Sequence, residues 1–221
     1  MAVFLNVISP SLLFPPTRGG ESDFLRVSST IINEKEFMRR ENKIILIGYR
    51  CTGKTSIGKR LAGRLGVPFI DTDRLVEAAT GKTIKALIET RGWVFFREKE
   101  REAITTLTSL EKSVIATGGG AVMDKENAAI LKKEGLVIWL VADEDTILER
   151  MLADAATAEQ RPPFSTDDSG KEIRDTLTIR TPVYSRLADF SVDTGLSGID
   201  ESVGKILHFL TKLRGNDPLG R

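Results

Sequence analysis

Residues 48–55 read Gly-Tyr-Arg-Cys-Thr-Gly-Lys-Thr, a complete match to the phosphate-binding loop (P-loop) pattern G-x-x-x-x-G-K-[ST]. An apolar run at 44–47 precedes the motif and is typical of a buried parallel strand. Residues 56–65 follow it with apolar side chains at helical spacing. A strand, a glycine-containing turn and a helix N-terminus direct backbone N–H groups and the positive helix end at a phosphate. The motif therefore predicts a nucleoside triphosphate site, with Lys54 reaching the outer phosphates and Thr55 binding Mg²⁺.

Strand-like and helix-like segments alternate from residue 43 onward. This alternation predicts an α/β fold in which helices cover both faces of a parallel sheet, a three-layer sandwich. Ligands of such folds bind at the carboxyl ends of the strands. The strand candidates are 43–48, 67–71, 113–117, 136–141 and 190–193. The clearest helical patterns cover 95–110, 143–152, 171–186 and 199–213.

The composition excludes several classes of protein. The formal net charge is +1, so the chain lacks the strong basic charge of proteins that bind nucleic acids or membrane surfaces in bulk. Cys51 is the single cysteine, which excludes an internal disulfide and fits a reducing compartment. No apolar run is long enough to cross a bilayer. We therefore expect a cytoplasmic protein with neither nucleic-acid nor membrane partners.

Residues 1–40 differ from the rest of the chain. They contain Pro10, Pro15 and Pro16, have no acidic residue before Glu21, and show no sustained helical or strand period. We expect either a disordered extension or a start assigned too far upstream. In the second case, Met38 would be the first residue of the protein. An organellar transit peptide is the alternative. The folded domain is expected at 41–214, followed by a short tail at 215–221.

Two carboxylates end the second strand candidate. Asp71 and Asp73 are separated by one residue, so both lie on the same side of an extended backbone. One can hold a Mg²⁺-bound water, and the other can accept a hydrogen bond from a hydroxyl that receives a phosphoryl group. The alternative is that Asp73 caps a helix beginning at Leu75.

Three glycines, Gly118, Gly119 and Gly120, end the third strand candidate. Consecutive glycines permit unusual backbone angles and allow a ligand to approach the main chain closely. They lie at the sheet edge that bears the P-loop, which favours a role in the site over an ordinary turn.

Three arginines are candidates for binding anionic groups. Arg97 follows two phenylalanines in a helical pattern, and Arg180 precedes Thr-Pro-Val-Tyr in another. Arg161 lies in the polar, proline-containing segment 154–170, which we interpret as a mobile lid, with a plain surface loop as the alternative. Arginine binds carboxylates in a planar bidentate geometry, and a lid arginine can stabilise charge on a transferring phosphoryl group.

Taken together, these motifs closely resemble those of the shikimate kinase family. The family order is P-loop, Asp-x-Asp, Phe-Arg-x-x-Glu, Gly-Gly-Gly, Arg-Pro and Arg-x-Pro-x-Tyr, and the resemblance covers about residues 43–213. It implies a P-loop kinase of the nucleoside monophosphate kinase type, with a five-stranded parallel sheet, an acceptor-binding region at about 73–103 and a closing lid. The implied reaction is ATP-dependent phosphorylation of the 3-hydroxyl of shikimate, a step of chorismate and aromatic amino-acid biosynthesis, by a monomer.

The resemblance also implies a role for each motif residue. Asp73 would be the general base, while Lys54 and Arg161 would neutralise phosphate charge. Thr55 would bind Mg²⁺, with Asp71 in its outer shell. The expected shikimate ligands are Asp73, Arg97, Gly118, Gly119, Gly120 and Arg180. The expected ATP ligands are Cys51, Thr52, Gly53, Lys54, Thr55, Ser56, Arg150 and Arg161.

Three positions depart from the usual family pattern. Cys51 replaces a frequent glycine or alanine and places a thiol near the phosphates, where alkylation could inactivate the enzyme. Ile88 replaces a frequent phenylalanine, and Trp93 stands where an acidic residue is common.

Two other functions stay open at this point. A kinase of gluconate or of a nucleoside monophosphate would share the P-loop and the lid, but the acceptor arginines and the three glycines argue against it. A non-catalytic ATP-binding regulator would be expected to lack Lys54, Asp73 or Arg161, and all three are present.

Overall fold

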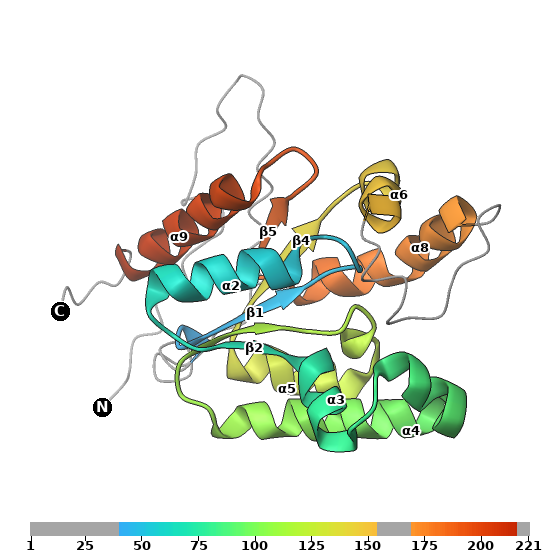
Figure 1. The fold of residues 1–221 in the computed structure, drawn as a ribbon. Helices are drawn as coiled ribbons and strands as arrows, with labels where there is room; N and C mark the ends of the chain where they lie inside the picture. The colour runs from blue at the N-terminus through green and yellow to red at the C-terminus, as the bar shows by residue number, and fades with distance from the viewer. Residues whose placement is uncertain (1–39, 154–168, 216–221) are drawn as a thin grey trace, which may run out of the picture.

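The structure is a computed structural model that describes residues 40–153 and 169–215. Its centre is a five-stranded parallel sheet with the strand order β2-β3-β1-β4-β5 (Figure 1). The five predicted strands are confirmed, each within two residues of the observed bounds. The strands are β1 Lys43–Ile47, β2 Phe69–Asp71, β3 Ser113–Ala116, β4 Leu136–Val141 and β5 Phe190–Asp193.

Strand β1 lies at the centre of the sheet and is buried along its whole length. Ile45 faces Ile115 of β3 on one side and Val137 of β4 on the other. Successive side chains of a strand point to opposite faces, so Ile44 and Leu46 pack in one core while Ile45 and Ile47 pack in the other. An apolar run without polar alternation is what a strand buried on both faces requires.

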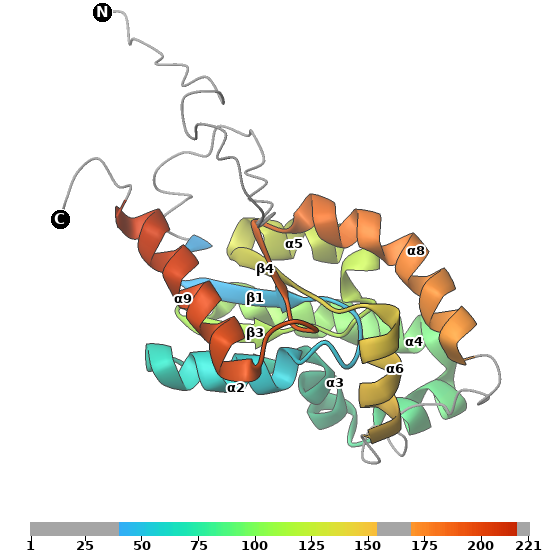
Figure 2. The same ribbon diagram turned by 90° about the horizontal axis from the view of Figure 1, so that it is seen from above.

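Helices cover both faces of the sheet and complete the predicted three-layer sandwich. Helices α2 and α9 lie on one face, and α4 and α5 lie on the opposite face (Figure 1). Helix α6 lies beyond the carboxyl ends of the strands and packs beside α8 (Figure 2). The helices are α2 Lys54–Leu65, α3 Thr72–Thr80, α4 Ile84–Thr106, α5 Lys125–Glu134, α6 Glu144–Ala153, α8 Ser169–Leu187 and α9 Ile199–Gly215, with short 3₁₀ turns η2 Leu107–Ser109 and η3 Ala121–Met123.

Helix α4 begins earlier than predicted. The sequence pattern predicted a helix over 95–110, whereas α4 begins at Ile84 and Thr83 caps it by accepting a hydrogen bond from the N–H of Ala86. Gly92 breaks its helical geometry with φ 79° and ψ 171°, a conformation that is nearly restricted to glycine. Because of this break, the sequence pattern did not reveal the part of the helix before Gly92. That part packs Ile84 and Leu87 into a separate small core.

Helix α3 also corrects the sequence interpretation. It begins at Thr72 rather than Leu75, and Asp71 is its N-cap, because the Asp71 carboxylate accepts a hydrogen bond from the N–H of Asp73 at 3.1 Å. The alternative in which Asp73 caps the helix is therefore wrong.

The predicted extension, lid and tail lie outside the described residues except at their edges. Arg40 is buried, residues 169–170 begin α8, and Gly215 ends α9. In the described ranges, no helix combines the length and apolarity needed to span a membrane.

Buried ion pairs hold the amino-terminal side of the sheet. The ammonium of Lys43 donates hydrogen bonds to Glu134 at 2.7 Å and to the carbonyl of Leu107 at 2.8 Å, and both charged side chains are almost fully buried. Arg40 pairs with Asp189, whose carboxylate also accepts a hydrogen bond from the backbone of β4. These contacts connect β1 to the helical layer below it and to β5.

Replacing Lys43 by methionine is predicted to destabilise the fold strongly, because it removes the ammonium opposite the buried Glu134 carboxylate. We expect the free energy of unfolding to fall by about 3–5 kcal/mol, measured by urea denaturation. The double variant Lys43→Met/Glu134→Leu should recover part of this loss.

The exposed pair Arg60–Asp200 offers the matched control for this variant. Arg60→Met should cost about 0–1 kcal/mol. A loss below about 1 kcal/mol for Lys43→Met itself would contradict a stabilising role for the buried pair.

Candidate active site

Two adjoining cavities lie at the carboxyl ends of the strands. The larger, about 690 Å³, is lined by the P-loop and is called here the P-loop pocket. The smaller, about 310 Å³, is lined by residues 118–120, the glycine loop, and is called the glycine-loop pocket. Arg50, Asp73 and Ile84 line both cavities, so these residues mark the junction between them.

The P-loop connects β1 to α2 in the arrangement that the sequence predicted. Gly48 has φ 140°, and a side chain there would meet the carbonyl oxygen of Leu140 at 2.4 Å, so only glycine fits. Helix α2 has no acidic residue in its first turn, which leaves its positive end available to an anion. The ammonium of Lys54 donates hydrogen bonds to the carbonyls of Gly48 at 2.9 Å and Tyr49 at 2.6 Å.

The other predicted nucleotide ligands surround the same pocket. Cys51, Gly53, Lys54, Thr55, Ser56 and Arg150 line the P-loop pocket. Thr52, by contrast, is buried, and its hydroxyl donates a hydrogen bond to the carbonyl of Tyr49 at 2.8 Å. Its side chain therefore supports the loop.

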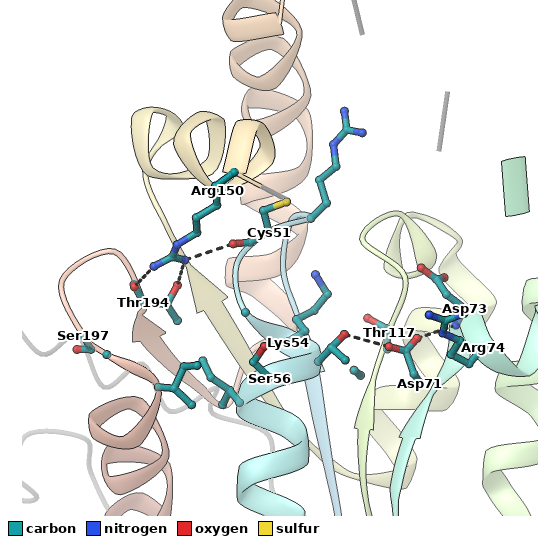
Figure 3. A pocket seen from close by; sticks show the side chains of 18 of the residues that line it. Cys51, Lys54, Ser56, Asp71, Asp73, Arg74, Thr117, Arg150, Thr194 and Ser197 are labelled. Atoms are coloured by element: carbon teal, nitrogen blue, oxygen red, sulfur yellow. Dashed lines mark hydrogen bonds between the residues drawn. The ribbon is translucent and has the colours of Figure 1, made fainter. Parts of the chain in front are cut away.

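Arg150 of α6 ties the P-loop to the end of β5. Its guanidinium donates hydrogen bonds to the carbonyl of Thr194 at 2.6 Å and to the carbonyl of Cys51 at 3.3 Å (Figure 3). The hydroxyl of Thr194 in turn donates to the carbonyl of Thr52 at 3.2 Å. Arg150 thus has a positioning contact with the loop in addition to facing the pocket.

Cys51 adopts a left-handed backbone conformation with φ 60°. Residues with a β-carbon rarely adopt this conformation, so glycine would be accommodated there with less strain than cysteine. The thiol is partly exposed and borders the P-loop pocket.

Thr55 and Asp71 form an oxygen-donor pair below the P-loop. The hydroxyl of Thr55 donates a hydrogen bond to Asp71 at 3.1 Å, and Lys54 lies between Arg150 and this pair (Figure 3). Within residues 40–153 and 169–215, no cluster of three or more His, Cys, Asp or Glu side chains could hold a metal by itself. Hydroxyl and carboxylate oxygens nevertheless fit Mg²⁺, which keeps several waters and phosphate oxygens as ligands.

Glu100 holds Arg97 at the wall of the glycine-loop pocket. The Arg97 guanidinium donates a hydrogen bond to the Glu100 carboxylate at 2.5 Å, one helical turn away on α4. Burial raises the pKa of Glu100, the Arg97 charge opposes that rise, and the nearby Asp73 and Asp124 carboxylates add to it. Arg97 also lies over the ring of Phe96 at 5.2 Å, so its orientation is fixed from two sides.

The three glycines provide space rather than unusual backbone angles. None of the three has a positive φ, so that part of the sequence interpretation is wrong. A β-carbon on Gly118 would lie 2.5 Å from the Asp73 carboxylate, and one on Gly120 would lie 2.6 Å from the Arg97 guanidinium. The chain's own charged groups therefore lie against the glycine loop, and the close approach of a ligand stays a prediction.

Tyr184 of α8 fixes the same loop from the other side. Its hydroxyl donates a hydrogen bond to the carbonyl of Gly119 at 2.5 Å, and its ring is buried. Arg180, one turn earlier on α8, lies 5.7 Å from the centre of the Tyr49 ring and lines the glycine-loop pocket. The structure thus brings Arg97 and Arg180 to one cavity from two distant helices.

Most of the predicted site residues converge at these two pockets, while Arg161 lies outside the described residues. Sequence reasoning did not assign roles to Tyr49, Arg50, Glu100 or Tyr184. A spacing of three residues from Arg97 on a helix could have singled out Glu100. Nothing local in the sequence distinguishes Tyr49 and Arg50 from other P-loop positions.

A P-loop in this sheet order, beside a second small pocket with two arginines, defines a P-loop kinase of the nucleoside monophosphate kinase type. The family model described as shikimate kinase matches residues 50–211. A shikimate kinase from Syntrophus aciditrophicus is 45% identical, with 84% of this chain and 100% of that protein covered. The solved shikimate kinase from Acinetobacter baumannii in complex with shikimate has a TM-score of 0.74 and 32% identity, with 81% of this chain and 98% of that chain covered. The chain belongs to the shikimate kinase family.

Replacing Glu100 by glutamine is predicted to change how stability depends on pH. Because its pKa is raised in the fold, Glu100 contributes most to stability below its ordinary pKa of about 4.5, and this contribution is lost as the pH rises through the raised value. The free energy of unfolding of Glu100→Gln should therefore improve relative to the parent as the pH rises above about 4.5. A difference between the two proteins that does not vary with pH, in urea titrations, would contradict the buried-carboxylate account.

Alkylation of Cys51 is predicted to inactivate the enzyme, because the modified thiol would project into the P-loop pocket. Mg·ATP at about ten times its Kd should slow inactivation by iodoacetamide about tenfold, since only the free protein reacts. Cys51→Ala should keep its own starting activity under the same treatment. Equal inactivation rates with and without Mg·ATP would place the reactive thiol away from the nucleotide.

Proposed function

We propose that the chain transfers the γ-phosphoryl group of ATP to the 3-hydroxyl of shikimate, giving shikimate 3-phosphate and ADP. This reaction belongs to chorismate and aromatic amino-acid biosynthesis. The observation that carries the proposal is the junction of the two pockets at Asp73, with Arg97 and Arg180 on the walls of the smaller one. A small acid with several hydroxyls suits that arrangement of two cations and one carboxylate.

The P-loop pocket would hold the nucleotide. Backbone N–H groups of the loop and the α2 N-terminus would bind the phosphates, and Lys54 would exchange its contacts with loop carbonyls for phosphate oxygens. Arg150 borders the pocket beside Thr194, and Arg161 is proposed to add a further positive charge. Thr55 would bind Mg²⁺, with Asp71 in its outer shell; the ion would neutralise charge on the phosphates.

The glycine-loop pocket would hold shikimate. Arg97 and Arg180 would bind its carboxylate through charge-assisted hydrogen bonds, and the glycine loop would contact the ring through its backbone. Glu100 and Tyr184 would act as positioning residues, one through Arg97 and the other through Gly119.

Asp73 would act on the acceptor hydroxyl during transfer. The hydroxyl oxygen forms a bond to the γ-phosphorus while the bond to the bridging oxygen breaks, and ADP leaves with that electron pair. The hydroxyl proton passes to the Asp73 carboxylate, which lies at the junction of the two pockets. Lys54 would stabilise the negative charge that spreads over the phosphoryl oxygens. We propose that the enzyme does this as a cytoplasmic monomer with no nucleic-acid or membrane partner.

Arg180→Ala is predicted to weaken acceptor binding selectively. It removes a charge-assisted hydrogen bond worth about 1.5–3 kcal/mol, so the KM for shikimate should rise about 10- to 100-fold while the KM for ATP stays near the parental value. Arg186→Ala, an exposed position on the same helix, is the matched control. An unchanged shikimate KM in Arg180→Ala would remove Arg180 from the carboxylate site.

The acceptor itself is tested by ADP release from Mg·ATP with shikimate, gluconate and a nucleoside monophosphate assayed in parallel. The proposal predicts turnover with shikimate alone, and Asp73→Asn should lower this turnover while leaving ATP binding largely intact. Turnover with gluconate or a nucleotide, but not with shikimate, would identify a different kinase. ATP binding without turnover of any acceptor would favour the alternative function of a non-catalytic ATP-binding regulator.

A further inference from the structure

Arg50 lies where the two pockets meet. Of the three side chains that line both cavities, Asp73 is anionic and Ile84 is apolar, so Arg50 is the one cation of the described chain at that junction. Its backbone also faces the glycine loop, because a β-carbon on Gly119 would lie 3.4 Å from the Arg50 nitrogen. Arg50 therefore borders both the pocket that contains the P-loop and the pocket that contains the glycine loop.

The ring of Tyr49 supports the Arg50 side chain. Tyr49 is almost completely buried, and the Arg50 guanidinium carbon lies 5.6 Å from its ring centre. The Arg180 guanidinium carbon lies 5.7 Å from the same ring. Both distances fall within the range of cation–π attraction, so one buried ring positions a P-loop arginine and an acceptor-pocket arginine together.

The charges around the glycine-loop pocket favour a cation beside Asp73. The pocket is lined by three carboxylates, Asp73, Glu100 and Glu172, and by three arginines, Arg50, Arg97 and Arg180. Glu100 is paired with Arg97, and Arg180 is the proposed partner of the acceptor carboxylate, which leaves Arg50 as the arginine at the junction. A phosphoryl group arriving beside Asp73 brings further negative charge to a carboxylate that must accept a proton. Lys54 lies on the P-loop side, in contact with the Gly48 and Tyr49 carbonyls. A guanidinium between the two pockets would offset the repulsion at the point where it is greatest.

We propose that Arg50 is a catalytic residue that binds the γ-phosphoryl oxygens as they move from ADP to the acceptor oxygen. This inference rests on the proposed function for its acceptor. The acceptor oxygen bonds to phosphorus, the bond to the bridging oxygen breaks, ADP departs with the electron pair and Asp73 takes the proton. Arg50 neither gains nor loses a proton; it donates hydrogen bonds to the oxygens whose charge increases in the transition state.

The variants Arg50→Met and Arg50→Lys test the proposal. Methionine keeps much of the side-chain length without the charge, and lysine keeps the charge without the planar fork of donors. We expect kcat with shikimate to fall about 100-fold in Arg50→Met and less in Arg50→Lys, with both KM values within about threefold of the parent. Arg60→Met, which removes an exposed arginine of α2 that lines neither pocket, is the matched control.

Calorimetric titration with MgADP separates catalysis from loop structure. The proposal expects an unchanged Kd in Arg50→Met, because the contact forms only during transfer. A kcat within about threefold of the parent would overturn the proposal, as would a loss of MgADP affinity in step with kcat. If the parent itself does not phosphorylate shikimate, the proposed function fails. The same comparison is then made on slow ATP hydrolysis, where an unchanged rate in Arg50→Met would overturn the role of Arg50.

Discussion

The burial of β1 between β3 and β4 is the constraint on which the site depends. Because β1 is apolar on both faces, it must occupy the middle of a parallel sheet, and the loops after β1, β2 and β3 then emerge at one edge. Those loops are the P-loop, the segment that begins with Asp71, and the glycine loop. Hydrophobic burial therefore assembles three chemically different segments from separate parts of the sequence.

Buried charged groups have different environments at the two ends of the sheet. At the amino-terminal side, Lys43 and Glu134 are buried together and satisfy each other. At the carboxyl side, burial raises the pKa of Glu100, although its carboxylate accepts a hydrogen bond from the Arg97 guanidinium. Perturbed pKa values are a common property of functional sites, and Glu100 lines the glycine-loop pocket together with Arg97.

The sequence predicted the sheet and much of the site because those features are local. Apolar runs identify strands, and the P-loop pattern has a recognisable strand and helix around it. The start of α4 was missed because Gly92 interrupts the helical periodicity. Unusual backbone angles were wrongly expected in the glycine loop. The glycines there leave room for the side chains of Asp73 and Arg97, which lie far away in the sequence. Arg50 and Tyr49 could not be singled out either, since their significance depends on pockets and on α8, which only the folded chain brings together.

The central claim is that one acceptor lies between the two arginines with a hydroxyl directed at Asp73 and the P-loop pocket. A crystal structure of the complex with MgADP and shikimate tests this most directly. The account predicts the shikimate carboxylate between Arg97 and Arg180, and the 3-hydroxyl within hydrogen-bond distance of Asp73 on the side facing the nucleotide. A carboxylate directed at the P-loop, or a ligand bound outside the glycine-loop pocket, would contradict it.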